Sequence, residues 1–264
     1  MRLYEVELVA AIEAAKKAEV AILEVYAKPF EVEIKEDDSP VTIADKTADE
    51  IIRGHLAPLF PEDGFLTEES EDNPSRHEKK RVWIVDPVDG TKEFVSRNGE
   101  FTTNIALCVD HEIVVGVINL PTQGILFYAV KGQGAYRLDA DGKVTRIRVS
   151  DRVDHLRCMR SISFFQPREA LFLKNNATYF EGEPKPVGAA LKFAALAEGR
   201  CDFFIRLSGC TKEWDVAPGD LIVNEAGGFM VQPDGTPFRY NREDVYNRAG
   251  YVMGNKLQPW MLES

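Results

Sequence analysis

The chain has 264 residues, of which 44% are hydrophobic, enough for one large core or two fused subdomains. It carries 32 basic and 43 acidic residues, which gives a net charge of −11. The overall field of such an acidic protein repels polyanions, which argues against a nucleic-acid polymer or an anionic membrane as its partner. A local anion site is still compatible with this charge if cations or a few basic side chains neutralise it.

The amino-terminal residues lack the basic head, apolar block and cleavage site of a signal peptide. No apolar run reaches the ~20 residues that span a bilayer. The four cysteines form no C-x-x-C pair and have no histidine spacing typical of zinc: Cys108, Cys158, Cys201 and Cys210. We therefore expect free thiols and a cytoplasmic protein, with peripheral attachment to the inner membrane left open.

The first half begins with two helical patterns. Apolar residues recur at helical spacing over residues 5–27, which predicts an amphipathic helix that ends before Pro29. A second helical stripe covers residues 44–59 and is closed by two prolines. Asp45 and Asp49 lie off that stripe, so the pattern does not account for them.

From residue 82 the pattern changes to strands. The apolar run 82–85 is typical of a strand buried on both faces. Further β-rich runs follow, separated by turn residues, at 102–109, 113–119, 125–130 and 144–149. Helices followed by an antiparallel meander indicate an α+β first half.

Beyond about residue 150, helices and strands alternate. Predicted helices at 189–198 and 215–226 each stop at a glycine. Predicted strands cover 201–207, 229–231 and 251–253, and a short terminal helix follows. We predict an α/β protein with a metal-binding α+β subdomain at 1–140 and an α/β subdomain at 141–264 that completes the active site.

The segment Asp86-Pro87-Val88-Asp89-Gly90-Thr91 follows the buried strand and is the leading candidate site. Two carboxylates one turn apart can converge on hard cations that prefer oxygen ligands, with the Val88 carbonyl between them. The N–H groups of Gly90 and Thr91 open a helical turn that can hold a phosphate. Read alone, the segment also fits an Asp-Pro turn followed by an ordinary helix cap.

Other acidic residues strengthen the metal interpretation. Glu68 belongs to a Glu-Glu pair that alone fits a solvated loop, while Asp215 and Asp45 lie where helix caps are common. Held with Asp86 and Asp89, Glu68 and Asp215 bring the charge to about −4, which is too repulsive without divalent cations. We therefore predict two or three Mg²⁺ ions that activate a water and polarise a phosphoryl oxygen.

Four motifs in this order resemble those of the inositol monophosphatase superfamily: SPVTIAD at 39–45, LTEES at 66–70, DPVDGT at 86–91 and WDVAPG at 214–219. The resemblance spans nearly the whole chain. It implies a layered αβαβα sandwich of the inositol monophosphatase/fructose bisphosphatase type. It also implies a magnesium-dependent and lithium-sensitive phosphatase.

The resemblance assigns roles residue by residue. The implied metal ligands are the side chains of Glu68, Asp86, Asp89 and Asp215 and the carbonyl of Val88. A hydrogen bond between Thr91 and Asp45 would orient the attacking water, and Glu68 would assist. Substrate contacts are expected from Asp89, Gly90, Thr91, Lys192, Arg206 and Asp215.

The residues after Thr91 concern the choice of substrate. The runs KEF at 92–94 and RNGEFTTN at 97–104 resemble the 3′(2′),5′-bisphosphate nucleotidase branch, which acts on adenosine 3′,5′-bisphosphate. Segment 188–193 resembles the nucleotidase segment whose lysine, here Lys192, contacts the second phosphate. Ala190 departs from this pattern, because nucleotidases commonly carry a serine there.

Alternatives remain open from the residues alone. Lys192 and Arg206 also fit exposed surface positions, and inositol, sugar or histidinol phosphates would use the same metal centre. A non-catalytic anion-binding protein of this fold would be expected to lack one of the metal carboxylates or Thr91, and all are present. The expected partner is a small phosphorylated metabolite, a nucleotide bisphosphate, bound by a monomer or homodimer.

Overall fold

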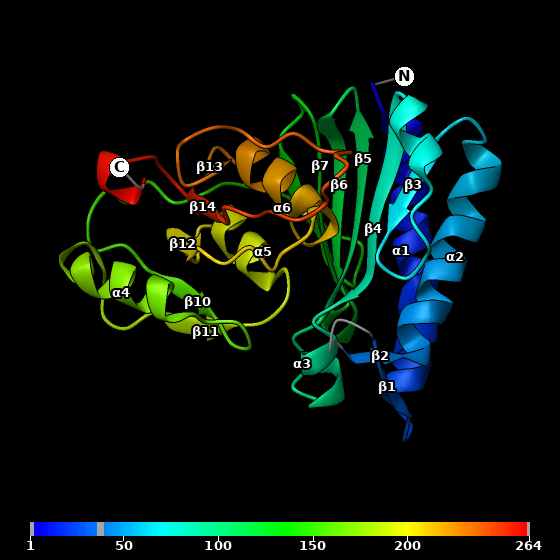
Figure 1. Ribbon diagram of the computed structural model, residues 1–264, viewed down its shortest axis with the longest axis horizontal. Coiled ribbons are helices and arrows are strands. Elements are labelled where there is room, and N and C mark those ends of the chain that lie inside the picture. Colours follow the sequence, from blue (N-terminus) through cyan, green and yellow to red (C-terminus); the bar gives the residue numbers. More distant parts are fainter. Residues whose placement is uncertain (1–2, 36–39, 263–264) are drawn as a thin grey trace.

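The computed structural model describes residues 3–35 and 40–262. Helices α1 (Glu5–Tyr26) and α2 (Ile43–Leu59) confirm the two predicted helices and form one outer layer (Figure 1). The buried side of α1 is mostly alanine, and these small residues let α2 pack closely against it. Ser39, the first residue of a predicted motif, lies outside the described residues.

A seven-stranded sheet forms the second layer, with the strand order β3-β4-β5-β6-β7-β8-β9. Its strands are β3 (Gly64–Thr67), β4 (Arg81–Asp89), β5 (Thr102–Val109), β6 (Glu112–Leu120), β7 (Ile125–Val130), β8 (Ala135–Leu138) and β9 (Val144–Ile147). The predicted antiparallel meander is confirmed from β4 to β9, while β3 pairs with β4 in parallel. Helices cover both faces, so the central strands read as nearly continuous apolar runs.

Strand β4 is longer than its apolar run predicts, because it continues through the Asp-Pro motif. Asp86 pairs with Asn104 and Asp89 with Thr102, with a register shift between the two pairs. In a regular strand, residues three apart point to opposite faces. The shift breaks this alternation at Pro87, which has no N–H to donate, and allows Asp86 and Asp89 to present their carboxylates together.

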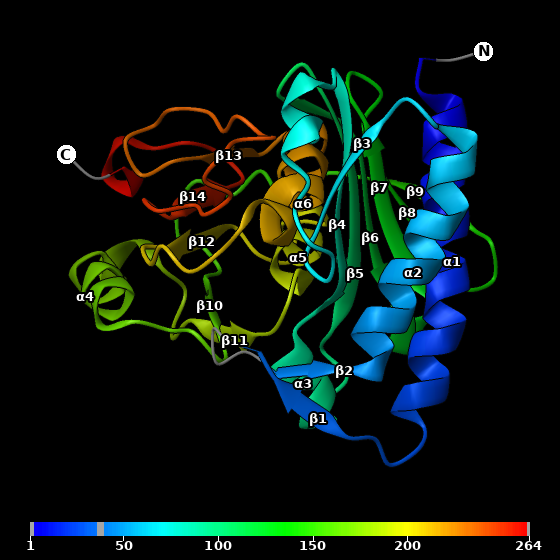
Figure 2. The same ribbon diagram turned by 45° about the vertical axis from the view of Figure 1, so that its right-hand side comes forward.

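The second half supplies three further layers (Figures 1 and 2). Helices α5 (Leu191–Ala197) and α6 (Glu213–Glu225) cover the large sheet. Beyond them lies a second sheet with the strand order β12 (Phe203–Arg206), β14 (Tyr251–Gly254), β13 (Phe229–Val231). Helix α4 (Pro167–Asn175) lies outside that sheet. The predicted αβαβα sandwich is therefore confirmed.

Short elements complete the chain. The pattern does not predict α4 or the parallel pair β10 (Met159–Ser161) and β11 (Lys185–Val187). Near the Asp-Pro motif lie the pair β1 (Val32–Ile34) and β2 (Pro40–Thr42), and helix α3 (Thr91–Val95). The 3₁₀ turns are η1 (Pro74–Glu78), η2 (Pro121–Gln123), η3 (Ala177–Tyr179) and η4 (Pro259–Met261).

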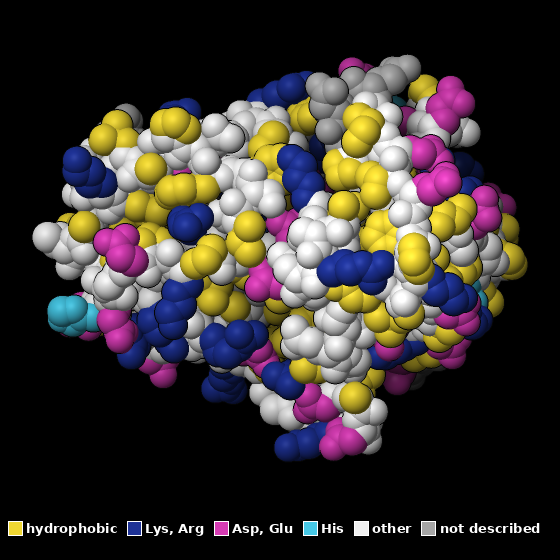
Figure 3. Space-filling model, turned by 90° about the horizontal axis from the view of Figure 1, so that it is seen from below, with side chains coloured by type: hydrophobic (Ala, Val, Ile, Leu, Met, Phe, Trp, Pro, Cys, Tyr) yellow, Lys and Arg dark blue, Asp and Glu magenta, His cyan; other side chains and the backbone are white. Residues whose placement is uncertain are grey.

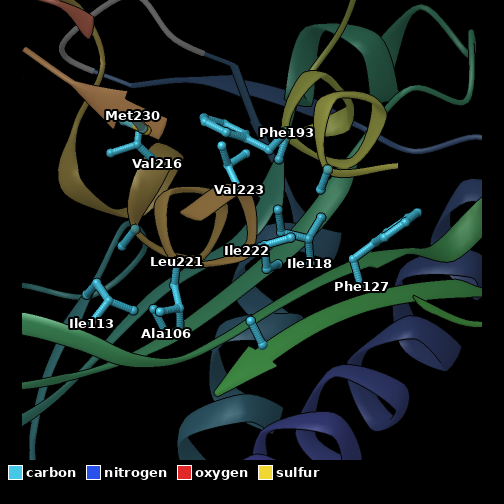
Figure 4. Packing of buried hydrophobic residues seen from close by; sticks show 14 of the residues in the cluster. Ala106, Ile113, Ile118, Phe127, Phe193, Val216, Leu221, Ile222, Val223 and Met230 are labelled. Atoms are coloured by element: carbon cyan, nitrogen blue, oxygen red, sulfur yellow. The ribbon is translucent and has the colours of Figure 1, made fainter. Parts of the chain in front are cut away.

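Helix α6 packs directly on the large sheet and joins the two halves (Figure 4). Its Leu221 and Ile222 belong to one buried cluster with Ile118 and Phe127 of the sheet. Gly116 permits the close approach, because a side chain there would lie 2.9 Å from the carbonyl oxygen of Pro218. The last strand of the large sheet, β9, ends at Ile147, a few residues beyond the predicted boundary at 140/141. The division into subdomains at 1–140 and 141–264 stays a proposal.

Two further features concern the helices and the cysteines. Among the described residues, none of the helices is both long and apolar enough to pass through a bilayer. All four cysteines are free thiols, and Cys210 alone of the four is exposed.

Candidate metal centre and substrate site

Three predicted carboxylates converge where the two halves meet. Asp86 and Asp89 come from the end of β4, and Asp215 from the first turn of α6. One carboxylate oxygen of each lies within 4.8 Å of the others. Two regions some 130 residues apart in the sequence thus build a single site, which an Asp-Pro turn alone does not explain.

Each carboxylate accepts a hydrogen bond through one of its oxygens. Asp86 Oδ1 accepts from the N–H of Val88 at 3.1 Å, while its Oδ2 is buried and lacks a hydrogen-bond partner. Asp89 Oδ2 accepts from Nδ2 of Asn104 at 3.2 Å. Asp215 Oδ2 caps its helix by accepting from the N–H of Lys212 at 2.6 Å. The N-cap of α6 is therefore Lys212, and the N-cap position weighed as an alternative for Asp215 is wrong, because Asp215 lies inside the first turn.

The cluster is electrostatically strained without a cation. Burial raises the pKa of Asp86 well above its usual value, and the charges of Glu68, Asp89 and Asp215 raise it further. Burial also raises the pKa of Asp89 to about 6 and that of Asp215 to about 7. A buried, partnerless carboxylate oxygen beside two other carboxylates is the environment that a hard divalent cation stabilises.

Glu68 lies near the three carboxylates but is not one of the converging set. Its Oε1 is 3.4 Å from Nζ of Lys35, and the same ammonium lies 2.5 Å from Oε1 of Glu69. The N–H of Glu68 donates to the carbonyl of Val85, which continues the pairing of β3 with β4. Lys35 is a neighbour that no motif in the sequence reveals.

Asp45 and Thr91 form the predicted pair. The hydroxyl of Thr91 lies 3.1 Å from Oδ1 of Asp45 and 3.2 Å from the carbonyl oxygen of Val88. Oδ2 of Asp45 accepts from the N–H and the hydroxyl of Thr42, at 2.8 and 2.7 Å. Burial raises the pKa of Asp45. Asp45 is thus fixed by the start of α2, and one oxygen is directed at Thr91.

The two predicted basic residues are buried, so the exposed positions weighed as alternatives are wrong. Lys192 is 8% exposed, and its ammonium donates to the carbonyl of Ala189. Burial lowers the pKa of Lys192, while the charges of Asp89 and Asp215 oppose this effect. Arg206 is 3% exposed and donates from Nη1 to the carbonyl of Phe164 at 2.6 Å, and its Nε has no partner.

Thr102 and Asn104 are site residues that the motifs do not identify as such. Both are fully buried, and the hydroxyl of Thr102 and the amide of Asn104 lie 3.5 and 3.2 Å from Asp89. The signal in the sequence is a polar run, Thr-Thr-Asn, inside an otherwise apolar strand. Buried polar side chains need partners, so such a run points to a polar site beside the strand.

Figure 3 shows the face on which α3 and the β1–β2 pair lie. Acidic side chains are visible in its hollowed centre, and Lys and Arg side chains gather around them. The face therefore combines the opposite charges that a cation-dependent anion site requires, although the whole chain is acidic.

Comparisons with known proteins identify the family of the chain. The sequence model of the inositol monophosphatase family matches residues 4–263. The chain is 34% identical over 255 residues to the 3′(2′),5′-bisphosphate nucleotidase CysQ of Aggregatibacter actinomycetemcomitans, covering 94% of this chain and 93% of the relative. It is 36% identical over 244 residues to CysQ of Escherichia coli (strain K12), covering 90% and 95%.

A solved structure extends the likeness to the fold. The crystal structure of CysQ from Bacteroides thetaiotaomicron, a bacterial member of the inositol monophosphatase family, aligns with a TM-score of 0.84 and 34% identity. The alignment covers 96% of this chain and 99% of that one. The phosphatase class that the motifs predict is confirmed, and the chain belongs to the inositol monophosphatase family.

Proposed function

We propose that this protein is a magnesium-dependent 3′(2′),5′-bisphosphate nucleotidase that removes the 3′-phosphate of adenosine 3′,5′-bisphosphate. The observation that carries the proposal is the cluster of Asp86, which is buried, with the half-buried Asp89 and Asp215, beside the buried cation of Lys192. Such a site offers one place for metal ions with a phosphate and another for a second anion. The nucleotidase names of the relatives support the same substrate class.

The proposed ligands for two or three Mg²⁺ ions are all oxygen donors: Glu68, Asp86, the Val88 carbonyl, Asp89 and Asp215. Oxygen ligands suit this ion, and the partnerless Oδ2 of Asp86 fits a role in binding it. Bound magnesium would lower the pKa of a water, polarise a phosphoryl oxygen and offset the charge of the leaving group.

The chain's own residues would orient and deprotonate the attacking water. Thr91 can donate its proton to Asp45 and accept a hydrogen bond from the water with its remaining lone pairs. Because burial raises the pKa of Asp45, its carboxylate is a stronger base than an exposed aspartate. The N–H groups of Gly90 and Thr91 would contact the phosphate that is cleaved, together with Asp89 and Asp215 at the metal centre.

Lys192 and Arg206 would bind the second phosphate, on the nucleoside's 5′-oxygen. Both are buried, so bulk water competes little with the phosphate for these two groups. Nε of Arg206 has no hydrogen-bond partner and could donate to the phosphate. Ala190 lies at the start of α5 and is fully buried. The missing serine hydroxyl at this position removes one neutral donor, which is worth about 1 kcal/mol and less than a charged one.

The test compares phosphate release from adenosine 3′,5′-bisphosphate and from inositol 1-phosphate at one magnesium concentration. We expect a clear preference for the nucleotide. A preference for the inositol ester would instead assign the protein to the inositol-phosphate branch. We further propose lithium inhibition, a role in sulfur-nucleotide turnover and a cytoplasmic location, the last supported by the unpaired thiols.

A further inference from the structure

Two glutamates of the segment after the Asp-Pro motif cross from the first half to the second. Oε1 of Glu93 accepts from the hydroxyl of Ser163 at 2.5 Å. Oε2 of Glu100 accepts from the N–H of Gly188 at 2.7 Å. Both belong to the runs that resemble the nucleotidase branch, and the sequence motifs assign no role to either. The structure shows that each ties the metal-binding half to one loop of the other half.

The two loops held in this way are neighbours. Ser163 and Gly188 follow the ends of β10 and β11, whose last residues, Ser161 and Val187, pair in parallel. The N–H of Ile162 donates to the carbonyl of Val187 at 3.1 Å and continues the pairing. The carboxyl ends of parallel strands meet at one edge, a common place for loops that bind ligands. The glutamates therefore fasten two adjacent loops at that edge.

The contact between the halves is tightly packed. A Cβ on Gly188 would lie 2.8 Å from Cγ of Glu93 and 3.1 Å from Cβ of Glu100. A Cβ on Gly90 would lie 3.0 Å from Cβ of Ala189, and Gly90 also has a φ of +91° that favours glycine. Ala189 itself has a φ of +45°, which is uncommon for a residue with a side chain. The loop is thus held in one conformation against the metal-binding half.

Each tie lies next to one of the two buried basic groups. The residue after Gly188 is Ala189, whose carbonyl accepts from the ammonium of Lys192. The residue after Ser163 is Phe164, whose carbonyl accepts from the guanidinium of Arg206. Moving either loop would therefore move the basic side chain that is bonded to it.

We propose that Glu93 and Glu100 are positioning residues that fix the distance between the metal-binding carboxylates and the pair Lys192–Arg206, and so select substrates with two phosphates. This inference rests on the proposed function. A second phosphate improves binding only if both phosphates reach their sites at once, so the separation of the sites must match the substrate. The glutamates act through the loops and do not contact the substrate.

The experiment compares adenosine 3′,5′-bisphosphate with adenosine 3′-monophosphate, which lacks only the second phosphate. In Glu100→Ala we expect the KM for the bisphosphate to rise roughly tenfold or more, since a charged acceptor is lost. The kcat and KM for the monophosphate and the magnesium concentration for half-maximal activity should change by about twofold at most. Glu100→Gln keeps an acceptor oxygen and should restore most of the preference.

Ser163→Ala tests the second tie without disturbing the core, because Ser163 is exposed. We expect a smaller rise, roughly fivefold, in the KM for the bisphosphate alone, as for one neutral donor. Glu225→Ala is the matched control. Glu225 also accepts from glycine N–H groups, those of Gly132 and Gly134, at 2.6 Å, but it lies far along α6 from Asp215. This variant should leave the preference unchanged.

Several results would overturn the inference. An equal loss with both substrates, or the same loss in Glu225→Ala, would mean that the glutamates have only a general structural role. An unchanged preference in both Glu100→Ala and Ser163→Ala would mean that they have no role in substrate choice. Thermal unfolding shows whether Glu100→Ala folds; if it does not, Ser163→Ala decides alone. A wild-type enzyme that does not prefer the bisphosphate would overturn the proposed function itself, before any variant is compared.

Discussion

The proposed metal-binding edge of the large sheet and the proposed substrate loops after β10 and β11 are built in different ways. Asp86 and Asp89 belong to a strand of nine residues that pairs with β5 along its length and with β3 up to Val85. The loops follow strands of three residues each, and Glu93 and Glu100 each bond to one of them. The comparison teaches that the carboxylates belong to regular secondary structure, whereas the loops proposed to hold the second phosphate are positioned by contacts between the two halves.

Asp89→Asn should have the largest effect, because it removes a charge from the centre of the metal-binding edge. We expect kcat to fall by several orders of magnitude with every phosphate ester. The metal-free variant should unfold at a higher temperature than the metal-free wild type, because one repelling charge is gone. If activity survives, the carboxylate cluster does not carry the reaction.

Thr91→Ala should lower kcat by about 10²–10⁴-fold, since it breaks the link from Asp45 to the attacking water. Magnesium affinity, measured by calorimetry, should stay nearly constant. Thr91→Ser is the matched control, because it retains the hydroxyl and should keep most of the activity. Equal losses in both variants would show that the hydroxyl is not the group that matters.

Lys192→Met tests the basic residue of α5 that is bonded to the loop after β11. The variant keeps the length of the side chain and removes its charge. We expect binding of adenosine 3′,5′-bisphosphate to weaken by about 1.5–3 kcal/mol, roughly tenfold to a hundredfold in KM, as for a lost charged hydrogen bond. Adenosine 3′-monophosphate should be affected much less. A comparable loss with both substrates would indicate that Lys192 acts on the acidic cluster and not on the second phosphate.

Asp220 should have the smallest effect on activity and concerns the stability of α6, which joins the two halves. It accepts from the hydroxyl of Tyr240 at 2.7 Å and from the amide of Asn224 at 2.6 Å. Burial raises the pKa of Asp220 to about 6, above the ~3.9 of an unfolded aspartate. The folded state therefore holds this proton more tightly, and the resulting stabilisation is present at low pH and lost as the pH rises through about 6.

Between about pH 4 and about pH 7, the free energy of unfolding of the wild type should fall by up to about 3 kcal/mol more than that of Asp220→Asn. Urea unfolding at saturating magnesium measures this difference, because the bound ion suppresses titration of the metal cluster. Parallel pH profiles would show that folding does not raise the pKa of Asp220.

Much of the site follows from local patterns in the sequence. The helical and strand periodicities locate most elements, because each buried face imposes its own spacing of apolar residues. The acidic residues in four ordered motifs indicate a metal centre, and three of them do converge. Helix α4 and the strands β10 and β11 escape prediction, since three-residue strands are too short to show alternation.

What the sequence determined by itself is therefore the order of the elements, the family and the chemical type of the site. The tertiary structure alone decided how distant groups meet. A register shift in β4 brings Asp86 and Asp89 together, and Lys192 is buried rather than exposed. Glu93 and Glu100 bond to residues 70 and 88 positions away. The physical reason is that local spacing governs secondary structure, whereas such contacts depend on how the packed layers bring separate loops into reach.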